Sequence, residues 1–595
     1  KLKVSALNIS EQIKWNITKD LDAVVQLGYN TNLAIRDIQE KAIDWYNYAG
    51  TKVVWSEPTQ ENSKYTKSYA NTDYYLVSGY LNWHKTLANA HNLSAMVGAQ
   101  YNYTQYERTE TAIKNIKPSL EIPNGSGEKT VKPEKWYEAM MSYFGRLGYD
   151  YKSRYLVDAN MRYDGSSKFQ AENRWQFFWG VMGAWRLTEE NFMRPLSPFL
   201  SNLKLRVSYG VLGNQNIGVY PYQQTYNLGH DYPFGNPAAL QSGAYMSVYN
   251  NPEITWEKTA ITDIGLDFSL FNGAFSGTVD YFYKYTSDIL APVEVSSIMG
   301  RSVGQSNVGA VSNKGIEVNL TYNGRIGNSF RFSIAPNFTW VKNAVEKLAN
   351  GATEEINNNR IVGQPIGIIY GYETDGLFVD QAEIDAAPEQ LVGKSSLKPG
   401  YVKYKDISGP DGVPDGKVDA QYDRTVLGST TPKFYYGLNL SASYKGFDFS
   451  ALLQGLGGHK RLIGSYMAYA FYNGGQIQRW QADNCWTEAN PDKWAEYPRL
   501  ETLNMNNTNL QTSDYWIRNA SFLRLKNVQI GYTLPKVWTK KIGLENVRVY
   551  ISGQNLCSFN SFYKGWDPEN EIGTGDSPSY YPINSIYSFG FNLKF

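Results

Sequence analysis

Residues 583–595, INSIYSFGFNLKF, decide the fold class of this chain. Large apolar residues occupy every second position from Tyr587 to Phe595, and small or polar residues occupy the positions between them. Because strand side chains point to alternate faces, this pattern predicts one apolar face and one polar face. An aromatic outer face and a polar inner face are typical of a barrel strand between lipid and water. The last strand of a β-sandwich would show the same alternation, so the rest of the chain has to decide.

The composition argues against several classes of protein. The 595 residues carry 57 basic and 56 acidic side chains, and this balance gives no case for nucleic acid as a partner. The sequence holds no apolar run of the ~18 residues that indicate a transmembrane helix. Aromatic residues reach 15%, with 47 Tyr and 16 Trp, and the interfacial girdles of a membrane barrel would account for them. A secreted carbohydrate-binding β-protein is the competing explanation.

Alternating segments joined by short turns recur along the chain. We predict about seventeen strands, each long enough to cross a bilayer at a tilt. They span approximately residues 4–17, 21–35, 68–84, 91–105, 136–150, 154–166, 174–186, 202–214, 256–270, 275–290, 313–324, 329–343, 432–444, 447–459, 518–533, 546–557 and 583–595. Asn272-Gly273, between two of them, is a strong hairpin signal. Single-chain bacterial barrels have an even number of strands, so an odd number predicts that further strands complete the wall.

Long segments rich in Gly, Asn, Pro, Ser and Tyr separate the hairpins. They cover approximately residues 38–66, 107–135, 215–254, 291–311, 346–430, 460–516 and 559–582. Short turns on one side and long loops on the other are typical of outer-membrane barrels, whose turns are periplasmic and whose loops are extracellular. A β-sandwich has loops at both ends and lacks this asymmetry. The sequence therefore predicts an all-β, antiparallel transmembrane barrel.

Residues with catalytic or metal-binding chemistry are scattered. Cys485 and Cys557 form no disulfide framework and could pair only if loops bring them together. The four histidines show no metal-ligand spacing. The sequence contains no nucleophile elbow, zincin motif or Walker A loop. We therefore predict that the chain is not an enzyme.

The acidic segment 406–423 is the one candidate for a metal site. Its aspartates Asp406, Asp411, Asp415 and Asp419 lie along Gly-bearing turns, and such carboxylates can surround Ca²⁺. The spacing departs from a calcium-binding loop because residues 410–413 look inserted. The favoured interpretation is a polar extracellular turn stiffened by its own aspartate hydrogen bonds, with Ca²⁺ as the alternative.

Aromatic residues gather in two of the long loops. The candidate substrate-binding residues are Tyr220, Tyr222, Tyr226, Tyr466, Tyr469, Tyr472 and Trp480. Exposed rings could stack on sugars or pack against peptide side chains. Equally, these rings could pack loop against loop or belong to an aromatic girdle. Three arginines, Arg206, Arg331 and Arg524, fall on polar strand faces and are predicted to point into the lumen.

Seven sequence blocks in order resemble the SusC/RagA family of TonB-linked outer-membrane transporters. They are YDGSSKF (163–169), LRVSYG (205–210), NPEITWEK (251–258), NKGIE (313–317), LRLKNV (523–528), SGQNL (552–556) and GWDPE (565–569). The resemblance extends from about Tyr151 to Phe595. It implies an outer-membrane barrel of roughly 22 strands filled by an N-terminal plug. It also implies a SusD-like lipoprotein as a lid, TonB as the energy-coupling partner, and oligosaccharides or peptides as substrates.

No part of residues 1–595 resembles the plug or a TonB box. We therefore expect this chain to be the C-terminal barrel portion of a longer transporter, without the plug and the first strands. Two alternatives stay open. One is a passive porin or a scaffold barrel in a larger outer-membrane assembly, and the other is an outer-membrane barrel enzyme. Lumenal arginines in this family would more often meet plug carboxylates than substrate.

Overall fold

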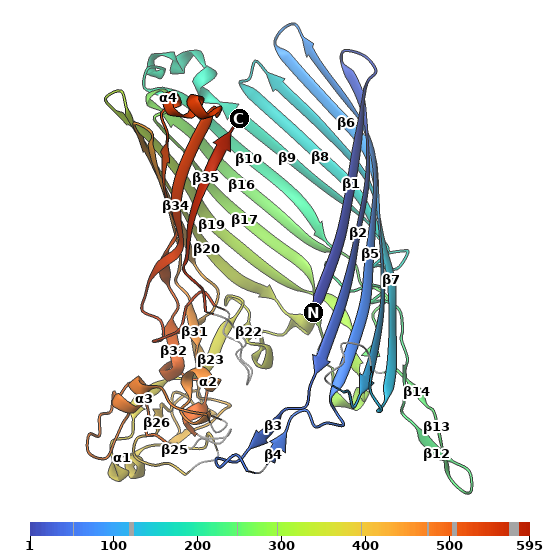
Figure 1. Cartoon of the computed structure of the whole chain (residues 1–595), viewed down its shortest axis with the longest axis vertical. Coiled ribbons are helices and arrows are strands. Elements are labelled where there is room, and N and C mark those ends of the chain that lie inside the picture. The colour runs from blue at the N-terminus through green and yellow to red at the C-terminus, as the bar shows by residue number, and fades with distance from the viewer. Residues whose placement is uncertain are drawn as a thin grey trace. The chain divides into compact units, whose positions relative to one another are not determined.

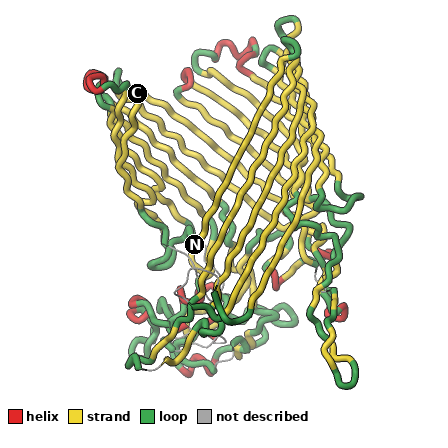
Figure 2. The backbone as a smooth tube through the Cα atoms, turned by 45° about the vertical axis from the view of Figure 1, so that its right-hand side comes forward, coloured by secondary structure: helices red, strands yellow, loops and turns green. Residues whose placement is uncertain are grey.

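Antiparallel strands make up most of the chain (Figures 1 and 2). The computed structural model describes residues 1–51, 53–117, 124–246, 248–293, 295–393, 396–472, 475–501, 508–570 and 582–595. Within them, one sheet holds 17 strands, which confirms the predicted number. These are β1 (Leu2–Asn16), β2 (Leu21–Glu40), β5 (Lys64–Leu87), β6 (His91–Lys114), β7 (Lys129–Tyr151), β8 (Tyr155–Ser166), β9 (Trp175–Arg186), β10 (Leu200–Asn214), β16 (Glu257–Leu270), β17 (Phe275–Pro292), β19 (Gln305–Ile326), β20 (Phe330–Lys347), β29 (Phe434–Tyr444), β30 (Phe447–Gly457), β33 (Phe522–Thr533), β34 (Asn546–Asn560) and β35 (Ile586–Lys594). No helix in the described residues is long and apolar enough to cross a membrane.

The register of the sheet keeps apolar side chains on one face. In β20, Phe330 lies opposite Tyr444 of β29, and Ile334 lies opposite Leu440. The short turn from β29 to β30 uses Lys445 and Gly446, with φ of 45° and 92°. Two successive left-handed residues fit a two-residue hairpin turn, and glycine adopts this conformation without a steric penalty.

Several strands extend further than the alternation predicts. The segment 107–135 was predicted to be a loop, but β6 and β7 remain paired as far as Ile113 and Lys129. Charged pairs accompany this extension: Arg108 lies 3.8 Å from Glu134, and Lys135 lies 3.7 Å from Glu107. These residues are polar on both faces, so hydrophobic alternation could not reveal a strand that continues into water.

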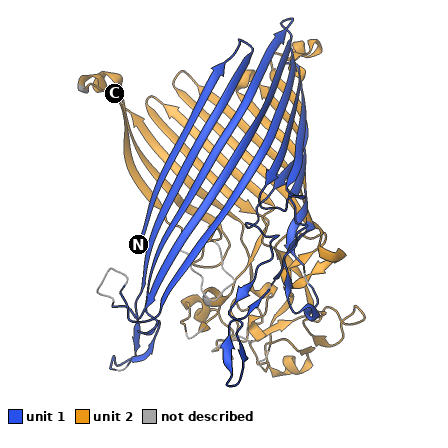
Figure 3. Cartoon of the chain, turned by 90° about the vertical axis from the view of Figure 1, so that its right-hand side faces the viewer, with its two compact units in different colours: residues 1–185, 207–262, 286–309 blue, residues 186–206, 263–285, 310–595 orange. Residues whose placement is uncertain are grey.

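The chain divides into two compact units (Figure 3). The first contains residues 1–185, 207–262 and 286–309, and the second contains residues 186–206, 263–285 and 310–595. Long loops of the first unit form narrow β-ribbons. The short elements of this unit are β3 (Asp44–Tyr46), β4 (Val53–Ser56), β11 (Asn227–Leu228), β12 (Tyr232–Phe234), β13 (Ala239–Gln241), β14 (Ala244–Tyr245), β15 (Val248–Tyr249), β18 (Ser302–Val303) and the 3-10 helix η4 (Ser297–Met299).

The long loops of the second unit contain more short strands and helices than those of the first unit, and they include hydrophobic clusters of their own. Its short strands are β21 (Glu354–Glu355), β22 (Arg360–Ile361), β23 (Ile368–Tyr372), β24 (Thr374–Leu377), β25 (Glu389–Gln390), β26 (Val402–Tyr404), β27 (Lys417–Val418), β28 (Arg424–Ser429), β31 (Lys460–Leu462) and β32 (Ile517–Asn519). Its helices are α1 (Gln381–Ala386), α2 (Ser465–Ala468), α3 (Arg479–Asp483), α4 (Lys536–Thr539), η1 (Leu187–Glu189), η2 (Asn191–Leu196), η3 (Phe271–Gly273), η5 (Ala349–Gly351), η6 (Ile356–Asn358), η8 (Thr508–Leu510), η9 (Asp514–Trp516) and η10 (Lys540–Ile542). One cluster contains Met467, Tyr497 and Trp516, and another contains Tyr404 and Trp486.

Candidate functional site

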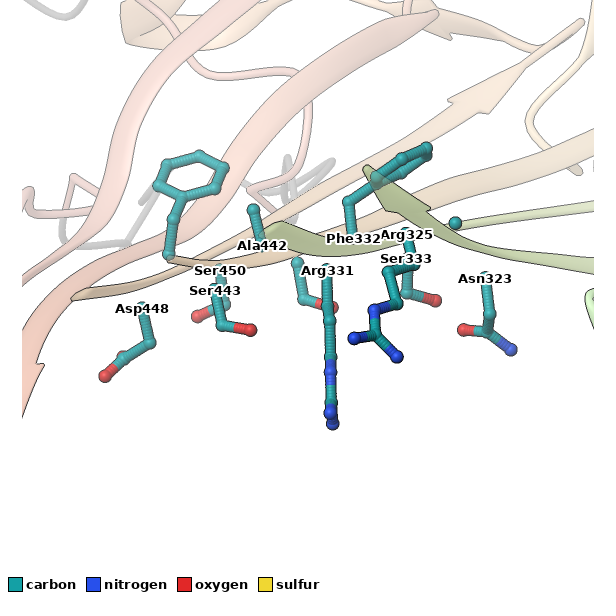
Figure 4. A pocket seen from close by; sticks show the side chains of 12 residues that line it. Asn323, Arg325, Arg331, Phe332, Ser333, Ala442, Ser443, Asp448 and Ser450 are labelled. Atoms are coloured by element: carbon teal, nitrogen blue, oxygen red, sulfur yellow. The ribbon is translucent and has the colours of Figure 1, made fainter. Parts of the chain in front are cut away.

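Residues from both faces of β19, β20, β29 and β30 line an open cavity of about 610 Å³ near the short turns (Figure 4). Arg331, Ser443 and Asp448 project from one side of the sheet, whereas Phe332 and Ala442 project from the other. The two faces therefore differ in polarity as the sequence predicts. A wall of this kind can face lipid on one side and water on the other.

The three arginines predicted to face the lumen have different surroundings. Arg206 lies 2.8 Å from Asp267 and 2.7 Å from Asp280, on neighbouring strands of the second unit. The side chain of Arg331 makes no hydrogen bond or ion pair with the described residues and is exposed. Of these two guanidinium groups, only that of Arg331 is therefore open to a partner from elsewhere.

Arg524, the third arginine, joins two of the sequence blocks in space. Its side chain is only 3% exposed, and Nη2 lies 2.6 Å from Oδ2 of Asp567. Its Nε lies 2.9 Å from Oε2 of Glu569, whose other oxygen lies 2.5 Å from Nζ of Lys526. Arg524 and Lys526 share one face of β33, and Asp567 and Glu569 are also two residues apart. The ion pairs therefore attach the loop after Phe562 to the wall, a contact that neither block indicates alone.

Most of the candidate aromatic residues of loop 460–516 pack inside the second unit. Tyr469 and Trp480 adjoin the cluster around Trp516, and Tyr472, 6% exposed, lies 5.8 Å from the Tyr469 ring. Burial raises the pKa of Tyr469 to about 12. The rings of Trp480 and Tyr563 pack edge-to-face, with 5.1 Å between their centroids. These rings thus follow the loop-packing alternative. The side chain of Tyr466 lies outside the described residues.

The three candidate tyrosines of loop 215–254 differ in exposure. The Tyr220 hydroxyl donates a 2.7 Å hydrogen bond to the backbone oxygen of Tyr137 on β7. Tyr222 packs against a buried cluster that contains Trp256. Tyr226 is 65% exposed and free to meet a ligand. The first two therefore anchor the loop to the wall of the first unit, and only Tyr226 retains an open ring.

The acidic segment is a turn held by its own carboxylates. Asp406 accepts a hydrogen bond from the Gly416 backbone at 2.7 Å, and Asp419 accepts from Gln421 and Tyr422. Buried Asp423 accepts three backbone hydrogen bonds. Within the described part of the chain, no three His, Cys, Asp or Glu side chains are grouped so that they could hold a metal ion. The geometry corresponds to the favoured polar turn, and Ca²⁺ binding stays a prediction.

One ribbon carries an exposed pair of tryptophans that the sequence pattern did not indicate. Trp45 of β3 lies directly opposite Trp55 of β4, with exposed fractions of 57% and 61%. Residues opposite each other in an antiparallel pair place their side chains on the same face. The pair therefore offers two adjacent indoles to the surrounding water. A Trp-Tyr dipeptide and a second Trp across a Gly-containing turn are the signal that could have predicted it.

The fold and the polar inner face define an outer-membrane β-barrel, and the comparisons agree. The chain belongs to the family described as TonB dependent receptor-like, beta-barrel, which matches residues 8–556. It is 30% identical to TonB-dependent receptor P3 of Formosa agariphila, over 89% of this chain and 53% of that protein. It is 30% identical to TonB-dependent receptor SusC of Bacteroides thetaiotaomicron, over 77% of this chain and 44% of SusC.

A solved structure of the RagAB peptide transporter shares the fold. Its TM-score is 0.82 at 23% identity, over 100% of this chain and 62% of that chain. The resemblance to SusC/RagA-type transporters is thereby confirmed, as is the location in the outer membrane. The chain spans about half the length of the curated relatives that it matches. These relatives are named as receptors and transporters rather than enzymes.

Proposed function

We propose that the complete protein imports oligosaccharides or peptides by TonB-dependent active transport, with a SusD-like surface lipoprotein as its lid. The observation that carries this proposal is family membership, joined to a wall that is apolar outside and polar inside. Similarity to SusC and to the RagAB peptide transporter supports import of large solutes. In this proposal the chain binds and guides its cargo without covalent chemistry.

One side chain of the wall, that of Arg331, is proposed to bind the plug domain. The side chain of Arg331 has no partner among the described residues, so it can donate hydrogen bonds to a carboxylate of a plug domain such as this family carries. TonB would act through that domain. An arginine is suited to this contact because its planar guanidinium holds a carboxylate through two hydrogen bonds.

Substrate contacts are proposed at the exposed rings. Trp45, Trp55 and Tyr226 present open faces that suit pyranose rings and apolar peptide side chains alike. The packed rings of loop 460–516 instead hold that loop in a fixed conformation. Its outer surface is the proposed binding surface for the SusD-like lipoprotein.

The test is uptake in the bacterium that carries the protein. Labelled oligosaccharides and peptides are supplied to cells with and without the gene, with and without a protonophore, and after removal of TonB. Uptake of one class that needs the gene, the proton gradient and TonB supports the proposal. Uptake that persists without gradient and TonB would indicate a passive pore and contradict it.

A loop deletion tests the lid. Removing residues 462–478 should abolish co-purification of the lipoprotein and reduce uptake. The matched control removes residues 230–242, the tip of the β12–β13 ribbon, and leaves loop 460–516 intact. Unchanged co-purification and uptake after the first deletion would contradict the assignment of this loop.

A further inference from the structure

Two lysines lie directly opposite each other on the apolar face of the wall. Lys314 of β19 pairs in register with Lys342 of β20. The preceding pair on the same face is Ile316 with Trp340, and the pair before that is Val318 with Phe338. Phe434 of β29 continues this aromatic row, with its ring 6.1 Å from Phe338. The lysines therefore sit immediately beyond an aromatic band, on the side of the long loops.

The electrostatics of this lysine pair is unfavourable as it stands. Opposite side chains in an antiparallel pair have Cβ atoms about 5 Å apart, and like charges there are destabilising. Neither ammonium group has a hydrogen bond or ion pair with the described residues, and both side chains are exposed. Glu346, four residues further along β20, accepts a hydrogen bond from Ser312. The repulsion grows where a lipid phase lowers the local dielectric constant.

A hollow adjoins one member of the pair, Lys342. A cavity of about 340 Å³ is lined by Trp340, Lys342, Gln364, Pro432 and Lys433, among other residues. Its rim is held in place by backbone hydrogen bonds that join Val345 to residues 363 and 364. The Ile366 N–H also donates to Oδ1 of Asn343 at 2.6 Å. Lys342 thus lies beside a preformed space of the size of a sugar-phosphate headgroup, and Lys314 lies opposite it on the neighbouring strand.

We propose that Lys314 and Lys342 bind the phosphate group of a lipid in the outer leaflet of the outer membrane. A phosphate between the two ammonium groups replaces their repulsion by two charge-assisted hydrogen bonds. The position on the lipid-facing side, beyond the aromatic band, is where lipid headgroups lie. The ring of Trp340 and the 340 Å³ hollow accommodate the rest of the headgroup. The two lysines are separate from the proposed import path, because they lie on the opposite face of the sheet.

The experiment measures binding of fluorescent lipids to the full chain in phosphatidylcholine nanodiscs. One probe is a diphosphorylated lipid A, and the second is the same lipid after enzymatic removal of its phosphates. A third arm uses inorganic phosphate in detergent at the same phosphate concentration. Lys314→Gln/Lys342→Gln is the test variant, and Lys314→Arg/Lys342→Arg keeps both charges. The matched control, Lys129→Gln/Lys132→Gln, removes two charges from the extended end of β7.

The test variant should bind diphosphorylated lipid about 10-fold more weakly, whereas the arginine variant and the matched control should bind like the wild type. Heat-modifiable migration in gels verifies that every variant is folded. Unchanged lipid affinity in the test variant, or equal binding of the phosphate-free lipid, overturns the proposal. Equal affinity for inorganic phosphate would show a free-anion site and would overturn the assignment to lipid.

Discussion

Two sets of long loops, both rich in Tyr and Trp, use their aromatic residues in opposite ways. In the first unit, Trp45 and Trp55 project from a narrow ribbon and stay more than half exposed. In the second unit, Tyr472, Tyr497 and Trp516 are buried by neighbouring loop segments. Aromatic content alone therefore does not indicate a binding surface. A two-stranded ribbon has no second layer to cover its rings, whereas several loop segments together can enclose theirs.

The largest effect is expected where the loop core of the second unit is broken. Trp516→Ala removes a ring that is 1% exposed and should lower the free energy of unfolding of this loop region by about 3–5 kcal/mol. Trp494→Ala, at 69% exposure, is the matched control and should change it by less than about 0.5 kcal/mol. Urea-dependent proteolysis of the loops measures both. Equal effects of Trp516→Ala and Trp494→Ala would contradict the distinction between buried and exposed rings.

The wall itself should respond according to face. Leu320 lies on the apolar face, so Leu320→Arg should destabilise the sheet by about 2–4 kcal/mol if it lies at the bilayer midplane. Asn319→Arg, one residue earlier and on the polar face, should be tolerated. Unfolding in urea, followed by gel migration, gives the comparison. Tolerance at Leu320 together with sensitivity at Asn319 would mean that the faces are reversed.

The attachment of a loop to the wall provides an intermediate effect. Arg524→Gln removes the two hydrogen bonds to Asp567 and the ion pair with Glu569, which keeps Lys526, and should cost about 2 kcal/mol because the lost hydrogen bonds join charged groups. Faster proteolysis near residues 561–570 is the expected readout. Arg325→Gln is the control, because the Arg325 side chain hydrogen-bonds, among the described residues, only to its own turn. Identical cleavage rates in the two variants would argue against this attachment.

The exposed ribbon should affect ligands rather than stability. Trp45→Ala and Trp55→Ala should each weaken substrate binding by about fivefold, corresponding to about 1 kcal/mol of ring contact. The free energy of unfolding should change little, because both rings are already in water. Binding titrations with oligosaccharide and peptide probes measure the effect. A loss of stability without a loss of affinity would place these rings among the packed ones.

The smallest effect is expected on the stability of the loops at acidic pH. A hydrogen bond from Lys493, reinforced by Lys403, holds the pKa of Asp375 below its ordinary value of 3.8. A lowered pKa means that Asp375 stabilises the folded loops above about pH 4, and this contribution is lost as pH falls through the folded-state pKa. Because the carboxylate is 37% exposed, solvent screening limits the change to under about 1 kcal/mol. Asp375→Asn should remove this part of the acid dependence in proteolysis rates. An acid dependence identical to that of the wild type would contradict the assignment.

Sequence reasoning succeeded where a single physical rule acts on each residue. Lipid on one side and water on the other impose an alternation of period two, so the number of wall strands can be counted from the alternation alone. The acidic segment followed the same logic, because aspartates near Gly turns bond to their own backbone. Strand ends were missed at β6 and β7, where both faces are in water and no alternation survives.

The fold class, the outer-membrane location and the family can be predicted from the sequence, because they depend on local patterns and on ordered blocks. The tertiary structure was needed to show which rings are exposed, that Arg524 binds Asp567, and that Lys314 lies opposite Lys342 on the neighbouring strand. Those contacts join residues far apart in the chain or on different strands. Their energies depend on register and packing, which no single segment contains.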